Sequence, residues 1–189
     1  GYCECSAADN SACCCQAPTT HHRATKPVYH ECPNGDVEDI EWMRASASIP
    51  IASRPVKLGG KRLLDGGVSD PIPVKWMLSR GYEKNVVVLT RDVKYRKKAN
   101  PKMQLFLKAV LHKYPAFLKD LEERHIHYNE TLEELASLEK EGRIHIIRPS
   151  SPIQAAMIER DESNLERIYQ TGRADMKKDL EKLKAYLDS

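Results

Sequence analysis

Hydrophobic residues follow two different spacings along this chain, and the changes of spacing predict where strands and helices lie. Short apolar runs bounded by turn residues predict strands at 27–31, 56–58, 62–64, 85–90 and 144–147. Apolar positions at helical spacing predict helices at 37–47, 74–80, 103–111 and 117–121. Capping boxes of the form S/T-x-x-E at 131–134 and 163–166 predict two further helix starts, and a last helix is expected over 174–187.

The order of these elements indicates the fold class. A strand, a helix and further strands follow one another up to residue 90, as in an α/β layer. The run from Asn85 to Thr90 is short, apolar and rich in β-branched residues, which predicts a central strand buried on both faces. Helical periodicity dominates the remainder, so we expect an α/β sheet followed by a mostly helical C-terminal region.

Glycines and an aspartate mark the most informative turn. Gly59 and Gly60 lie between two predicted strands and favour a hairpin, because glycine adopts the positive φ of tight turns. Asp65 directly follows the second strand, and neither Gly66 nor Gly67 has a side chain that would cover it. A carboxylate at a strand end lies where α/β folds carry reactive groups, and it can accept a proton or orient a base. The same triplet also suits a plain tight turn, since Asp and Gly dominate turns for local reasons.

Composition changes sharply near residue 25. Residues 1–25 contain no Val, Ile, Leu, Met, Phe or Trp, yet they hold five of the six cysteines: Cys3, Cys5, Cys13, Cys14 and Cys15. With so little to bury, this segment is expected to be disordered or not native to the protein. The alternative is a Cys/His metal-binding module over residues 1–32 that includes His21, His22 and His30, although its C-x-C and C-C-C spacings fit structural zinc poorly.

The composition of the whole chain excludes several classes of protein. Its 189 residues are 41% hydrophobic and 30% charged, which is enough apolar material for a core and excludes a wholly disordered or collagen-like chain. The longest run that looks buried, Val86–Leu89, is far shorter than the roughly 20 residues of a membrane span. The formal net charge of +3 is too mild to indicate nucleic acid, so no nucleic-acid partner is expected.

Several motifs within residues 26–91 occur in a succession typical of one family. A helix ends in Ala45-Ser46-Ala47-Ser48-Ile49-Pro50, and a hairpin then leads to Leu63-Leu64-Asp65-Gly66-Gly67. Pro71-Ile72-Pro73 follows, and a strand ends in Val88-Leu89-Thr90-Arg91. This succession resembles the C-terminal half of the bacterial patatin-like phospholipases. The resemblance implies a partial three-layer α/β sheet, followed by the helical extension found in some members.

The chemistry that this resemblance implies is lipid acyl hydrolysis by a Ser-Asp dyad. Asp65 matches the dyad aspartate, which accepts the proton, and Gly66 and Gly67 match its supporting turn. A nucleophilic serine of this kind occupies a G-x-S-x-G elbow. No serine of this chain has glycine at both −2 and +2, and no glycine-rich oxyanion loop is present. We therefore expect a chain truncated at its N-terminus, inactive alone, with no cofactor and no bound metal.

The expected organisation has three parts: the Cys-rich segment 1–25, the patatin-like part 26–98 and the helical extension 99–189. The resemblance implies a lipid or ester substrate and a cytoplasmic protein. The basic stretch from Arg91 to Lys102 is either a solvated loop or a peripheral contact with anionic lipid head groups. A different hypothesis is a non-catalytic binding module whose helical C-terminal half contacts other proteins.

Overall fold

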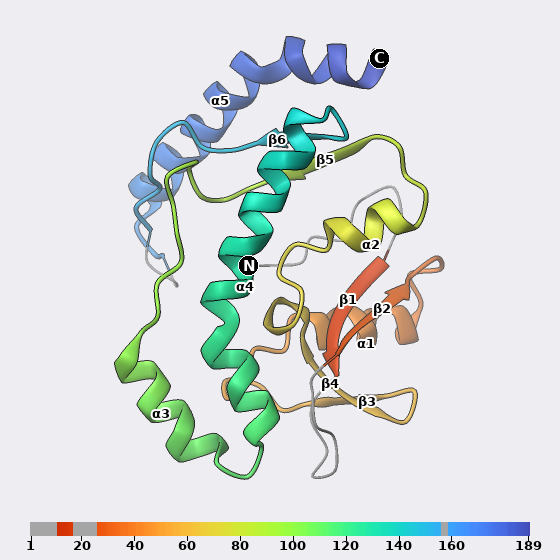
Figure 1. Ribbon diagram of the computed structural model, residues 1–189, viewed down its shortest axis with the longest axis vertical. Coiled ribbons are helices and arrows are strands. Elements are labelled where there is room, and N and C mark those ends of the chain that lie inside the picture. Colours follow the sequence, from red (N-terminus) through yellow and green to blue (C-terminus); the bar gives the residue numbers. More distant parts are fainter. Residues whose placement is uncertain (1–10, 17–25, 156–158) are drawn as a thin grey trace. The chain divides into compact units, whose positions relative to one another are not determined.

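The computed structural model describes residues 11–16, 26–155 and 159–189. Strands and helices are mixed and the chain ends in long helices, which confirms the α/β class with a helical C-terminal region (Figure 1). The strands are β1 (Ser11–Gln16), β2 (Pro27–Glu31), β3 (Val56–Leu58), β4 (Lys61–Asp65), β5 (Asn85–Val88) and β6 (Ile144–Ile147). The helices are α1 (Val37–Ser46), the 3₁₀ turn η1 (Gly66–Val68), α2 (Val74–Ser79), α3 (Pro101–Leu111), α4 (Pro115–Lys140) and α5 (Glu162–Asp188).

These elements form two compact units, each built from two separate stretches of chain. Of the described residues, the first unit comprises those up to Pro73 and those from Lys97 to Thr131, and the second comprises those from Val74 to Arg96 and those from Leu132 onward. Units of this kind arise from packing between segments that are distant in sequence. Composition along the chain therefore does not mark where they begin and end.

The first unit contains a four-stranded antiparallel sheet in the order β2-β1-β4-β3. Strands β3 and β4 form the predicted hairpin, and Gly59 and Gly60 at its tip have φ of 52° and 71°. Positive φ at both central residues is the geometry of a type I′ turn, whose twist matches that of the flanking strands. The glycine pair thus determines the local structure that leads into Asp65.

Strand β1 corrects the expected break near residue 25. We expected residues 1–25 to be disordered or not native to the protein. Ser11–Gln16 is not disordered, because it lies inside the sheet and pairs with both β2 and β4. Ladder hydrogen bonds to two neighbours involve only the main chain, so they do not require the aliphatic residues that this segment lacks. Composition alone underestimated what the backbone contributes here.

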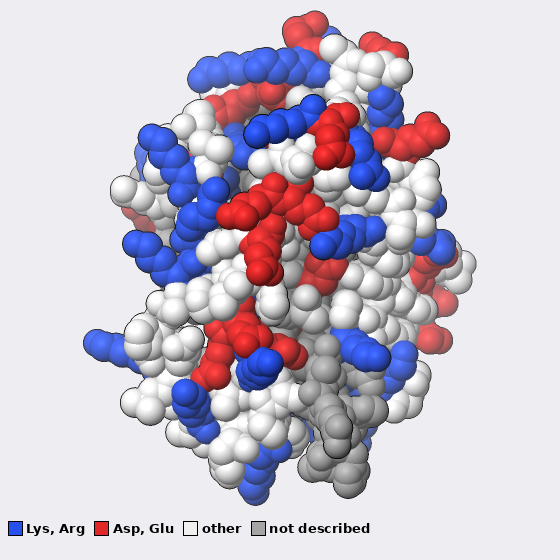
Figure 2. Space-filling model, in the orientation of Figure 1, with Lys and Arg blue, Asp and Glu red and all other residues white. Residues whose placement is uncertain are grey.

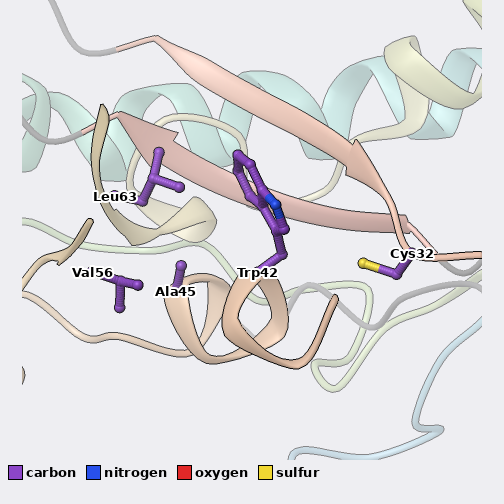
Figure 3. Close-up of a cluster of buried hydrophobic side chains, with 5 residues drawn as sticks. All are labelled: Cys32, Trp42, Ala45, Val56 and Leu63. Atoms are coloured by element: carbon purple, nitrogen blue, oxygen red, sulfur yellow. The ribbon is translucent and has the colours of Figure 1, made fainter. Parts of the chain in front are cut away.

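The sheet of the first unit has a hydrophobic cluster on each face. Successive residues of a strand point to opposite faces, so Leu63 and Leu64 of β4 enter different clusters. Leu63 joins the cluster in Figure 3, in which Trp42 projects from α1 toward the strands: Cys32, Trp42, Ala45, Val56 and Leu63. Leu64 packs instead with Val68 and with Phe117 of α4. The double apolar position at the end of β4 therefore reflects helices on both sides of the sheet.

Helix α1 forms where predicted but buries a different face. The helix was predicted from apolar residues that recur at helical spacing, and three of these remain exposed: Val37, Ile40 and Met43. The buried residues are Trp42, Ala45 and Asp39. A carboxylate can occupy this face because Asp39 Oδ2 accepts hydrogen bonds from the main-chain N–H groups of Asn34 and Gly35, at 2.9 and 2.8 Å.

The two long helices differ from the prediction in their ends. Helix α4 runs through Thr131, whose hydroxyl donates to the His127 carbonyl within the helix at 2.9 Å, so the predicted helix start there is wrong. Helix α5 does start next to the second capping box, but its N-cap is Asp161, which accepts from the Ser163 N–H at 3.0 Å. It continues through the separate helix that we expected over 174–187.

The second unit is built around the parallel pair β5 and β6. In the described part of the chain β5 pairs with β6 alone, and Val86 and Val88 are 41% and 61% exposed, so the expectation of burial on both faces is wrong. Tyr186 of α5 connects that helix to the starts of both strands. Its hydroxyl accepts from the Asn85 N–H at 2.8 Å and donates to the Arg143 carbonyl at 3.1 Å.

The charged surface carries both signs. In the face drawn in Figure 2, Lys and Arg side chains are interspersed with Asp and Glu side chains. Such mixing on this face agrees with the mild net charge of the chain. Among the helices of the described residues, none combines the length and the hydropathy that crossing a bilayer requires.

Candidate active site

Asp65 is the last residue of β4 and is held on both sides by main-chain contacts. It lies opposite Cys14 of β1 in the sheet register. Its own N–H donates to the carbonyl of Ser48, just beyond α1, at 2.9 Å. Strand β4 therefore ends at a defined point between a neighbouring strand and the end of a helix, which is where the sequence predicted the reactive carboxylate.

The Asp65 carboxylate has a defined orientation. Its Oδ1 accepts the Gly67 N–H at 2.7 Å, so the side chain caps the turn η1 that begins directly after it. The residue is half-buried, and no ion pair involves it among the described residues. A carboxylate held by a main-chain donor and left without a cation retains oxygen lone pairs that can accept a proton from a hydroxyl group.

Gly66 and Gly67 are buried within the turn that orients Asp65. The Gly66 carbonyl accepts from the N–H groups of Ser69 and Asp70, at 3.1 and 2.9 Å. The Gly67 carbonyl accepts from Nε of Arg124 in α4 at 2.6 Å. Each main-chain group named here has a partner, so the turn presents a fixed backbone to the carboxylate.

Arg124 and Tyr29 are residues of this site that the sequence did not reveal. Tyr29 of β2 donates from its hydroxyl to Oδ2 of Asp70, which secures the chain just after the turn. Arg124 lies 57 positions after Gly67, and neither residue belongs to a local motif. Their roles depend on which helix and strand pack beside the turn, and a single sequence contains no signal for that.

The serine hydroxyls near Asp65 point to other groups. Ser48 Oγ donates to the Arg44 carbonyl at 2.7 Å, and Ser69 Oγ donates to the Gly66 carbonyl at 3.5 Å. A nucleophilic serine needs a base within hydrogen-bond reach of its hydroxyl. These two serines are instead engaged with main-chain acceptors, in keeping with the lack of a G-x-S-x-G elbow around them.

A separate polar cluster lies at the start of α1. His30, Cys32 and Asp39 each offer one metal-ligand atom, and these atoms lie within 4.8 Å of one another. Imidazole, thiolate and carboxylate form a donor set that Zn²⁺ accepts. In the structure Asp39 is already engaged, since its Oδ1 lies 3.6 Å from His30 Nε2 and its Oδ2 accepts two N–H groups. Of the residues in the Cys/His module hypothesis, Cys3, Cys5, His21 and His22 lie outside the described residues.

The environment of Asp39 favours its ionised form. Burial is the largest influence and raises its pKa, but the hydrogen bonds from Asn34 and Gly35 and the neighbouring His30 together lower the pKa below its ordinary value. His30 also stacks on Trp42 with 4.3 Å between ring centroids. These contacts connect β2, the following loop and α1, so the cluster stabilises the element that leads to Ser48 and Asp65.

Comparison with known families assigns the two ends of the chain differently. Residues 114–188 match a domain of unknown function (DUF6363), and residues 4–77 match the patatin-like phospholipases. No match was found among curated proteins. From the motifs we expected the similarity to begin at residue 26. The match to the patatin-like phospholipases begins earlier, at residue 4, and therefore includes β1. Asp65, Gly66 and Gly67 all lie inside it. Over residues 4–77, the chain is therefore similar to a family of lipid hydrolases, the patatin-like phospholipases.

Proposed function

We propose that this chain supplies the aspartate of a Ser-Asp dyad for the hydrolysis of a lipid ester. The observation that carries the proposal is the Asp65 carboxylate, which the Gly67 N–H orients at a strand end within the matched residues. Similarity to patatin-like phospholipases supports a lipid substrate. The contacts of Gly66, Gly67 and Arg124 support a turn that keeps the carboxylate in place.

The proposed reaction is acyl transfer in two steps. A serine hydroxyl attacks the ester carbonyl while Asp65 takes its proton, and the carbon–oxygen bond to the leaving alcohol then breaks as that alcohol receives the proton. Water next attacks the acyl-serine while Asp65 takes a proton from it. The bond between the acyl carbon and the serine oxygen breaks, the proton returns to the serine oxygen, and the carboxylic acid is released. Main-chain N–H groups of a glycine-rich loop would stabilise the oxyanion in both steps.

The nucleophile and the oxyanion loop are proposed to lie outside these 189 residues. No serine here has flanking glycines at both −2 and +2, so the chain alone is expected to be inactive. In this proposal residues 26–98 belong to the patatin-like part and residues 99–189 form its helical extension. The protein would be cytoplasmic and would contact the membrane surface that holds its substrate.

The test compares the chain alone with a chain extended at its N-terminus by a G-x-S-x-G-bearing patatin-like segment. With a p-nitrophenyl ester, the chain alone should show no turnover above buffer. The extended chain should hydrolyse the ester, and Asp65→Asn should reduce its rate about a thousandfold or more, as for other acids of catalytic serines. Asp188→Asn, the same change at an exposed position of α5, is the matched control and should leave the rate unchanged.

Three results would contradict the proposal or a part of it. The assignment of Asp65 to a Ser-Asp dyad is wrong if the extended chain is active and Asp65→Asn leaves its rate of hydrolysis unchanged. The prediction that the chain alone is inactive is wrong if that chain hydrolyses the ester and Asp65→Asn abolishes the turnover. If the extended chain folds and stays inactive, the non-catalytic binding module is the better description of the helical half.

A further inference from the structure

Helix α3 carries several large apolar side chains, yet most of the helix is exposed. Only Leu107 of this 11-residue helix is buried. The large apolar residues exposed on it are Met103, Leu105, Phe106 and Val110. Leu105 and Phe106 are 72% and 51% exposed. Large apolar side chains that gather in the open on one helix mark a surface that a partner covers.

The surroundings of α3 are strongly basic. Residues 93–119 contain eight Lys or Arg and no Asp or Glu, although acidic residues number 27 in the whole chain. Among these cations, Lys98, Lys102 and Lys113 are exposed. At the lower left of Figure 2, where Figure 1 places α3, uncharged surface lies beside Lys and Arg side chains. Acidic partners come from α4, where Glu122 pairs with Lys108 at 3.2 Å.

We propose that α3 and its basic flanks form a binding site for the surface of an anionic lipid bilayer. Leu105, Phe106 and Val110 would enter the boundary between head groups and acyl chains, and the lysines would meet lipid phosphates. An exposed apolar helix flanked by cations is the composition of an interfacial helix. Its 11 residues span about 16 Å, which is too short to cross a bilayer and suits a helix that lies in its surface.

Charge favours a membrane over a second copy of the chain on this face. A two-fold contact would bring the same surface of both copies together and place one set of cations against the other. An anionic bilayer offers the opposite charge and an apolar interior at the same time. That this bilayer contains the substrate rests on the proposed function. Binding to the bilayer does not, because it is measured without catalysis.

The experiment is co-sedimentation of the full chain with phosphatidylcholine vesicles, prepared with and without phosphatidylglycerol. The wild-type chain should bind the anionic vesicles, bind the neutral ones at least about tenfold more weakly, and be released by high salt, which screens exposed charges. The double variant Leu105→Glu/Phe106→Glu should bind anionic vesicles at least about tenfold more weakly than wild type. Leu165→Glu/Tyr169→Glu, an equal change at exposed apolar residues of α5, should bind like wild type.

The possible outcomes separate this inference from its alternatives. Equal binding by the two double variants, or no preference for anionic vesicles, overturns it. A dimer in light scattering that only Leu105→Glu/Phe106→Glu dissociates, without vesicle binding, overturns it in favour of self-association. Should that variant not fold, Lys98→Gln/Lys102→Gln must lose the anionic preference instead. Asp65→Asn should bind vesicles normally, so failure of the hydrolase proposal and failure of this one are distinguishable.

Discussion

Arg124 donates from Nε to the carbonyl oxygen of Gly67 at 2.6 Å and thereby joins helix α4 to the turn that orients Asp65. The contact connects residues 57 positions apart, and the acceptor's own N–H donates to Asp65. The N–H and the carbonyl of Gly67 therefore both form hydrogen bonds that hold the turn in place. The helix that follows the matched residues 4–77 contributes directly to the candidate site.

Removal of this contact should weaken the fold around the turn. Arg124→Ala leaves the carbonyl of the buried Gly67 without its charged donor, so the free energy of unfolding should fall by about 1–3 kcal/mol. Urea unfolding followed by circular dichroism measures this change. Lys119→Ala, which removes an exposed pair on the same helix, is the control and should change stability by less than about 0.5 kcal/mol. If both variants lower the free energy of unfolding equally, the contact between Arg124 and Gly67 contributes no more to stability than an exposed ion pair.

Trp42 should be among the residues that contribute most to the stability of the first unit. It is buried between α1 and the sheet and stacks on His30. Trp42→Ala should therefore reduce the free energy of unfolding by about 3–5 kcal/mol, because it leaves a cavity that the surrounding residues fill only in part. Trp76→Ala, at a half-buried position of α2, should have a clearly smaller effect. A loss below about 1 kcal/mol at Trp42 would contradict the packing in Figure 3.

Two glycines should respond to alanine in opposite directions. Gly60 has φ of 71° with no atom within 4 Å of an added Cβ, so Gly60→Ala adds only backbone strain and should destabilise by about 1–2 kcal/mol. Gly172 lies inside α5 with equally open space, so Gly172→Ala should stabilise by about 0.5–1 kcal/mol through helix propensity. Thermal melts of both variants check the signs. A stabilising Gly60→Ala would argue against the type I′ turn.

Acid should remove the stabilisation that Asp39 provides. Its pKa is lower in the folded chain than in the unfolded one, so its contribution is complete above the unfolded value of about 3.9. That contribution is lost as pH falls from there through the folded pKa. Asp39→Asn should be less stable than wild type at neutral pH, and the difference should shrink below about pH 4. Urea midpoints measured across this range test the expectation. A constant difference at every pH would exclude the ionised carboxylate as its source.

Local chemistry in the sequence was enough for several elements. Paired glycines determine the β3–β4 hairpin because few other residues adopt positive φ at two successive positions. The same reasoning places Asp65 at a strand end, since a strand must stop where buried residues give way to a turn. Helix α1 and strand β6 were also predicted near their observed bounds, because each carries its own periodicity and turn residues.

Tertiary structure decided which faces are buried and which distant groups meet. The sequence could not show that β1 joins the sheet, because main-chain pairing leaves no trace in composition. It could not choose between the two faces of α1, because the N–H groups that satisfy Asp39 lie in a loop whose path depends on the fold. Arg124 reaches Gly67 only after α4 packs on the sheet through Phe117. Contacts of this range depend on the sum of many packing terms, whereas a hairpin depends on a few neighbouring dihedral angles.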